Sequence, residues 1–169
     1  DYIELLLGNA QIVAWALIVG GVAILLIERF VPDGKLIGVA ELPVGRALGV
    51  GLIQCLSMIP GVSRSGATIL GALSLGVERR TAAEFSFFLA IPTMLGATVL
   101  QVAKHHEALF ADVHGVGLSA VAVGFIVSFV VAIVVVKGFV HYVSRHGFSP
   151  FGWYRIVVGI AALVWLSAR

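Results

Sequence analysis

Long apolar runs separated by short polar stretches dominate the hydrophobic pattern of this chain. The first run, Ala10–Ile27, is about 18 residues long, enough to cross a hydrocarbon core about 30 Å thick as a helix. Three later runs predict further membrane-spanning helices: Ala83–Val102, Val116–Val136 and Trp153–Ser167. The pattern therefore predicts four spans, joined in part by loops at Ala103–Gly115 and Lys137–Gly152 and preceded by a short amphipathic lead-in at Asp1–Asn9.

A fifth apolar region, Ala47–Val77, is interrupted by Pro60 and Gly61. Each arm has about 13 apolar residues and would reach only about 20 Å as a helix, so neither arm can cross the membrane alone. Two arrangements are compatible with this pattern. The segment is either one broken span or a re-entrant hairpin that turns inside the membrane and leaves by the face it entered.

Basic residues distinguish the two arrangements, because Lys and Arg accumulate in the cytoplasmic loops of membrane proteins. A re-entrant segment would place eight of ten cations on one face: Arg29, Lys35, Arg46, Arg79, Arg80, Lys137, Arg145 and Arg155. Only Lys104 and Arg169 would lie opposite, whereas a single crossing would divide the same ten residues five against five. The charge bias favours a hairpin that enters from the cytoplasmic face, with both chain ends on the outer face.

The composition agrees with an all-α integral membrane protein. Hydrophobic residues make up 60% of the 169 residues and charged residues only 12%, about half of what soluble domains carry. The cations are scattered, so no basic patch predicts nucleic-acid binding. The single cysteine, Cys55, excludes an internal disulfide and a multi-cysteine metal site, and we expect it to be a packing residue.

The chemically distinctive stretch follows Pro60-Gly61 and contains Ser63, Arg64, Ser65, Gly66 and Thr68. A half-helix that starts near Ser63 would present free N–H groups and its positive dipole end inside the membrane, which favours an anion. Ser63 is a suitable cap, and Gly66 lets a ligand approach the backbone. The Arg64 guanidinium can bind phosphate through two hydrogen bonds, and Ser65 and Thr68 add hydroxyls. The stretch predicts a phosphate-binding site.

Alternatives remain open for two charged residues. Arg64 either binds a phosphate or pairs with a carboxylate such as Glu84, with Ser63 and Thr68 only capping a broken helix. Glu84 is either an accessory group that faces a cavity or an interfacial carboxylate beside Arg79 and Arg80. The histidines all fall in predicted loops, where a hydrophilic surface explains them better than a metal site: His105, His106, His114, His141 and His146.

The chain resembles the BacA-type undecaprenyl-pyrophosphate phosphatases at two stretches, Gln54–Leu70 (QCLSMIPGVSRSGATIL) and Ala83–Ala97 (AEFSFFLAIPTMLGA). The resemblance extends from the first span to Arg169. It implies a bacterial plasma-membrane enzyme that hydrolyses a C55 prenyl diphosphate to the monophosphate carrier of cell-wall synthesis. It also implies that Arg64 binds the diphosphate, and that the hydroxyls of Ser63 and Thr68 contact phosphate oxygens.

The same resemblance implies an inverted-repeat fold, in which each repeat has a re-entrant hairpin and three spans. Residues 46–169 match one repeat, and residues 10–27 match the last span of the other, within a single membrane domain over residues 1–169. The family's first hairpin, with two glutamates and a Ser-Ser-Thr-Gly-His tip, does not occur here. We therefore expect a piece of a longer protein, whose N-terminal half supplies most ligands of a Mg²⁺ or Ca²⁺ ion.

The expected partners are a polyprenyl diphosphate, the lipid bilayer and that N-terminal half, while a homodimer remains open. The alternative function, from a different class, is a transporter or flippase of a phosphorylated polyprenyl lipid, because inverted hairpins also occur in transporters. Phosphate release in detergent, where no second compartment exists, distinguishes the two.

Overall fold

The computed structural model describes residues 9–110 and 118–168, and this part of the chain is all-helical. Four of its helices are long and apolar enough to cross a membrane, which confirms the predicted number: α2 (Ala10–Phe30), α5 (Arg79–Phe110), α6 (Leu118–His146) and α7 (Ser149–Ser167). The remaining elements are short: the helices α3 (Val44–Gln54) and α4 (Arg64–Ser74), and the 3-10 turns η1 (Val39–Glu41) and η2 (Cys55–Met58).

The predicted loops are largely helical, so the predicted helix ends were wrong. α5 continues past Val102 through a non-helical residue, His105 (φ −122°, ψ 22°), and α6 continues past Val136 to His146. Four of the five histidines therefore lie on α5 and α6, and His114 lies outside the described residues. Polar residues can prolong a helix into the membrane interface, where water accommodates their side chains. The lead-in predicted for residues 1–9 lies, apart from Asn9, outside the described part.

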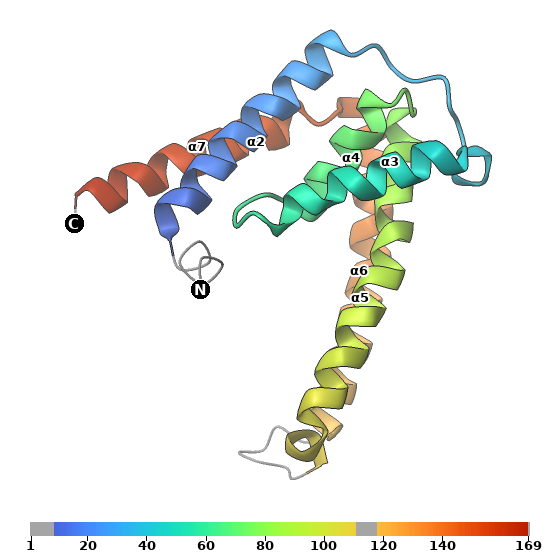
Figure 1. The fold of residues 1–169 in the computed structure, drawn as a ribbon, viewed down its shortest axis with the longest axis vertical. Helices are drawn as coiled ribbons and strands as arrows, with labels where there is room; N and C mark the ends of the chain where they lie inside the picture. The colour runs from blue at the N-terminus through green and yellow to red at the C-terminus, as the bar shows by residue number, and fades with distance from the viewer. Residues whose placement is uncertain (1–8, 111–117, 169) are drawn as a thin grey trace.

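The four long helices form two pairs, α2 with α7 and α5 with α6, which diverge from the region of α3 and α4 (Figure 1). α3 and α4 lie side by side as a helical hairpin, and α4 also contacts α5 and α2. The first and last described helices run antiparallel, so both ends of the described chain lie at the same end of this pair (Figure 1). The hairpin therefore lies where the two pairs meet.

Close packing of α2 on α7 depends on glycines. A Cβ added at Gly21 would lie 2.6 Å from the carbonyl oxygen of Gly152, and one at Gly159 would lie 2.9 Å from the carbonyl oxygen of Ala14. Small residues let two helix backbones approach in this way, which is the usual basis of helix pairing in membranes. These two glycines therefore set the distance between the first and the last described helix.

The buried core is small and surrounds α4. Ile69, Ala72 and Leu73 of α4 are buried against Val50 of α3 and Val143 of α6. By contrast, large apolar side chains along the outer faces of α5 and α6 are exposed, as expected of helices that face lipid or a further membrane segment. The best-packed part of the molecule is thus the element that carries the predicted phosphate-binding stretch.

A polar junction joins the ends of three helices. The carboxylate of Glu28, near the end of α2, forms an ion pair with Nε of Arg79 at 3.0 Å. It also accepts a hydrogen bond from the backbone N–H of Phe148, just ahead of α7. Arg79 also lies 3.6 Å from the carboxylate of Asp33. This network fixes the start of α5 relative to α2 and α7.

Candidate functional site

The tip of the hairpin is a tight turn pressed against α2. Gly61 has φ +87°, and a Cβ there would lie 2.6 Å from the carbonyl oxygen and 2.8 Å from the Cα of Val13. Both the left-handed backbone and the contact require glycine. The predicted break at Pro60-Gly61 is thus confirmed, and the contact places the start of α4 beside a membrane-spanning helix.

Ser63 caps α4, as predicted: its Oγ accepts the N–H of Gly66 at 3.1 Å, and its carbonyl accepts the N–H of Ala67 at 2.9 Å. The hydroxyls of Ser63 and Ser65 lie 3.2 Å apart. The backbone N–H groups of Arg64 and Ser65 have no acceptor in the described part of the chain. Two free amides and two hydroxyls therefore gather on the first turn of α4, the donor set that a helix start offers to an anion.

The side chain of Arg64 extends to α5, where its Nη1 donates to Oγ1 of Thr93 at 3.3 Å and its Nη2 lies 3.9 Å from Sδ of Met94. No carboxylate pairs with it among the described residues. Glu84, the alternative partner, instead accepts a hydrogen bond from Nε of Arg80 at 2.9 Å and forms an ion pair with it. The Arg64 charge is thus available for a ligand.

Thr68 lies apart from this hydroxyl pair. Thr68 is 1% exposed, its Oγ1 lies 2.6 Å from Oγ of Ser86 on α5, and its single hydroxyl proton is shared between the carbonyls of Arg64 and Ser65, each 3.1 Å away. In this structure the Thr68 hydroxyl is therefore engaged in fixing α4 to α5. Its predicted contact with a phosphate remains a prediction.

A cavity of about 200 Å³ adjoins the first turn of α4. Ser63, Ser65 and Gly66 line it on the α4 side, and among the described residues the single charged side chain in its lining is Arg155 of α7. The other lining residues are apolar or aromatic: Ile24, Ile69, Leu70, Phe139, Phe148, Phe151 and Tyr154. This hollow combines hydroxyls, one cation and apolar walls among the described residues.

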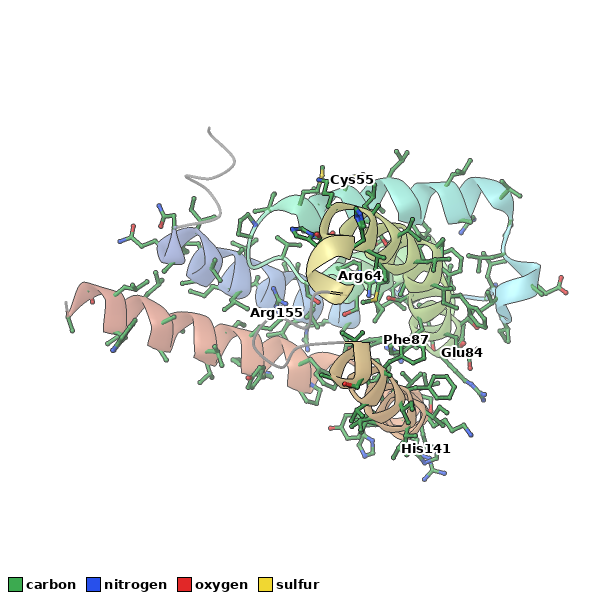
Figure 2. The ribbon with its side chains drawn as sticks, turned by 90° about the horizontal axis from the view of Figure 1, so that it is seen from below. Cys55, Arg64, Glu84, Phe87, His141 and Arg155 are labelled. Atoms are coloured by element: carbon green, nitrogen blue, oxygen red, sulfur yellow. The ribbon has the colours of Figure 1, made fainter. Side chains whose placement is uncertain are left out.

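Arg155 is the member of the site that the sequence interpretation missed, because it was counted as a cation at a membrane face. The structure places it within α7, with Nη2 donating to the carbonyl of Gly61 at 2.9 Å and to that of Ala16 at 3.3 Å. Figure 2 shows Arg64 on the hairpin helix and Arg155 reaching from α7 towards α2. An arginine inside an apolar span is a usable signal for a functional residue.

Glu84 belongs to a different region. It lines a second cavity of about 490 Å³ with Arg80, Lys137 and His141, between α5 and α6. Glu84 and His141 are labelled in Figure 2 on the side of the molecule away from Arg155. The pairing with Arg80 supports the interpretation of Glu84 as an interfacial carboxylate.

Two further expectations concern metals and Cys55. Within the described residues no three His, Cys, Asp or Glu side chains come together, so this part of the chain offers no ligand set for a metal ion. Cys55 is exposed rather than packed, which corrects its predicted role.

Comparisons with known proteins give the family. The family model described as Bacitracin resistance protein BacA matches residues 1–161. Similar curated proteins, each named undecaprenyl-diphosphatase, come from Novosphingobium aromaticivorans (61% identical over 99% of this chain and 62% of that protein), Rhizorhabdus wittichii (59% over 99% and 61%) and Sphingopyxis alaskensis (55% over 98% and 60%). The chain spans about three fifths of the length of these relatives. The chain belongs to the BacA family.

Proposed function

We propose that this chain carries the phosphate-binding part of a membrane enzyme that hydrolyses undecaprenyl diphosphate to the monophosphate and inorganic phosphate. The first turn of α4 is the observation that carries the proposal: two unpartnered amides, the Ser63 and Ser65 hydroxyls, and Arg64 without a carboxylate among the described residues. The relatives' name, undecaprenyl-diphosphatase, supports the substrate.

The proposal includes re-entry of the α3–α4 hairpin into the membrane. Both helices have 11 residues, about 17 Å, and are too short to cross. The start of α3 and the end of α4 lie on the same side of the hairpin. A backbone bridge joins Leu36, in the segment that leads into α3, to Val77, just after α4. The tip packs on Val13 and Ala16 of α2, a helix long and apolar enough to cross. These contacts support a hairpin that enters and leaves on one face.

In this enzyme the first turn of α4 binds the phosphoryl oxygens. Arg64 and the free amides stabilise the negative charge of the diphosphate, which increases on the leaving phosphate during hydrolysis. Ser63 and Ser65 bind oxygens on the cavity side, where Gly66 lets the ligand approach the backbone, and Thr68 holds the helix in position through Ser86. Exclusion of water by the surrounding apolar walls strengthens each of these interactions.

The proposed enzyme also includes a metal ion, an N-terminal half and a defined orientation in the membrane. A Mg²⁺ or Ca²⁺ ion would take its ligands mainly from an N-terminal half with a second, inverted hairpin, since the described residues provide no ligand set. The protein would lie in the bacterial plasma membrane with both ends of this chain on the outer face. Whether two copies associate as a homodimer does not affect the roles given to α4.

Arg64→Ala in the full-length protein tests the proposal. We expect phosphate release from undecaprenyl diphosphate in detergent to fall about 100-fold or more, because a positively charged group is removed from the reacting phosphate. Arg145→Ala, a charge-matched change at the exposed end of α6, should leave the rate unchanged.

Two outcomes would contradict this. Arg64→Ala with near wild-type release would remove Arg64 from the site. Wild-type protein that binds the lipid diphosphate but releases no phosphate in detergent would favour the transporter or flippase instead.

A further inference from the structure

Arg155 occupies an unusual place for a charged residue. It lies within α7, a helix long and apolar enough to cross a membrane, and its Nη2 donates to backbone carbonyls of two other segments, Gly61 at the hairpin tip and Ala16 of α2. Figure 2 shows this side chain extending from α7 towards these elements. A charge at such a place is costly without a partner and usually belongs to a functional site.

The carbonyl contacts do not neutralise this charge. No ion pair includes Arg155 in the described part of the chain, and its Nε is buried with no hydrogen-bond acceptor. A buried N–H without an acceptor is destabilising, and a carbonyl supplies only a partial negative charge. An anion would both accept a hydrogen bond from Nε and neutralise the charge.

A cavity adjoins Arg155. Of the described residues that line it, Arg155 is the one with a charge, and the Ser63 and Ser65 side chains belong to the same lining. Arg64 does not line this cavity, because its guanidinium extends to Thr93 on α5. The two guanidinium groups therefore lie at separate places around the first turn of α4: that of Arg64 beside α5, and that of Arg155 at the cavity.

We propose that Arg155 is the second phosphate-binding cation of the site and holds the phosphoryl group that Arg64 does not hold. The inference rests on the proposed function, because a diphosphate carries two phosphoryl groups and a monophosphate only one. Arg155 would then discriminate the diphosphate from the monophosphate. Its contacts with Gly61 and Ala16 keep the guanidinium in place before the lipid arrives.

Binding of inorganic pyrophosphate to the full-length protein tests this role without requiring turnover. We expect Arg155→Gln to raise the Kd of pyrophosphate about tenfold or more, because a charge-assisted contact is lost. Arg155→Lys, which keeps the charge, should raise it less. The effect on orthophosphate should be smaller than on pyrophosphate, and Arg145→Gln should change neither Kd.

Gly20→Ala gives an independent test that keeps Arg155 itself. A Cβ at Gly20 would lie 2.7 Å from Nη2 of Arg155, so the flexible end of that side chain must move. We expect weaker pyrophosphate binding with the fold retained. Gly124→Ala on α6, where a Cβ meets nothing within 4 Å, is the matched control and should bind as wild type. This pair keeps the test decisive if Arg155→Gln does not fold.

The kinetic result separates a binding role from a purely structural one. We expect Arg155→Gln to raise KM for undecaprenyl diphosphate more than it lowers kcat, with partial rescue by lysine. Wild-type pyrophosphate affinity in both Arg155→Gln and Gly20→Ala would overturn the inference. Arg155-dependent pyrophosphate binding in a protein that releases no phosphate from the lipid would instead refute the proposed function and leave the Arg155 assignment standing.

Discussion

Gly61 has no room for a side chain and no ordinary backbone conformation. Its φ of +87° lies in the left-handed region, and the Val13 backbone occupies the place where a Cβ would be. The carbonyl of Gly61 accepts a hydrogen bond from Arg155, and its backbone packs against Val13 of α2. Gly61 therefore connects the turn of the hairpin to both α7 and α2. The position of the turn that leads into α4 therefore depends on one glycine.

Gly61→Ala should destabilise the protein by about 2 kcal/mol or more, because left-handed backbone strain adds to a clash with a rigid backbone. The melting temperature in detergent measures this. Gly51→Ala in α3, where a Cβ meets nothing within 4 Å, should be neutral or slightly stabilising. Equal melting temperatures for the two variants would show that the tip is not held against Val13.

Sequence reasoning identified Ser63 as a cap because capping depends on residues three apart, and the structure confirms it. It did not find the role of Arg155, whose acceptor Gly61 is 94 residues away in the chain. The partner of Thr68, Ser86, was missed for a related reason: it lies on the following helix. Contacts between elements decide such roles, and a local pattern does not contain them.

At the scale of elements, the start of α5 depends on a carboxylate cap. Glu78 accepts the backbone N–H groups of Arg80 at 2.9 Å and Thr81 at 2.8 Å, and the Thr81 hydroxyl at 2.9 Å. Burial alone would raise the pKa of Glu78, but these hydrogen bonds and the nearby Arg80 charge outweigh it and lower the pKa below its ordinary value. The charged form is therefore favoured in the folded protein.

This cap makes stability depend on pH. Because the folded pKa is lowered, the contribution of Glu78 is fully present above the unfolded value of about 4.3 and is lost as the pH falls through the folded pKa. We expect the melting temperature to fall in that acidic range, and Glu78→Gln to reduce this dependence. Glu84→Gln, six residues further along and not at the helix start, should not reproduce the effect of Glu78→Gln. An unchanged acid profile in Glu78→Gln would contradict the assignment.

Hydropathy predicted the four spans because each must present apolar side chains over its membrane-embedded length. The ends of α5 and α6 were not predictable in this way, since charged or polar residues follow the apolar run in both helices. The helix nevertheless resumes after the non-helical His105 in α5 and continues to His146 in α6. The interruption at Pro60-Gly61 was found because turn-forming residues stand out in an apolar context. Hydropathy thus locates a membrane helix more reliably than it locates its ends.

At the scale of the whole molecule, the pairing of α2 with α7 holds the site together. Gly159→Leu should separate these helices, since a Cβ there already lies 2.7 Å from Cγ1 of Ile18 and 2.9 Å from the carbonyl of Ala14. We expect a loss of stability of about 1–3 kcal/mol, as overpacking usually causes. Spin labels on α2 and α7 would report a longer distance. Gly138→Leu on α6, with nothing within 4 Å of its Cβ, is the control.

The sequence contained the charge bias and the number of spans, but not which spans pair. Helices α2 and α7 stand near opposite ends of the described chain, and nothing in their own periodicity specifies that they meet. Their match lies in small residues at facing positions, which is apparent only once both helices are in place. For this reason the predicted site lacked Arg155, the group that α7 contributes.

The antiparallel α2–α7 pair also has a consequence for biogenesis. The ribosome completes α7 only after every other described helix, on the order of ten seconds after α2 at ordinary rates of translation. α2 carries its charges only near its end and can enter the lipid by itself, whereas α7 brings Arg155 into the bilayer. The carbonyls of Ala16 and Gly61 are already synthesised when that arginine leaves the translocon. The acceptors of the Arg155 side chain are thus made before α7 is.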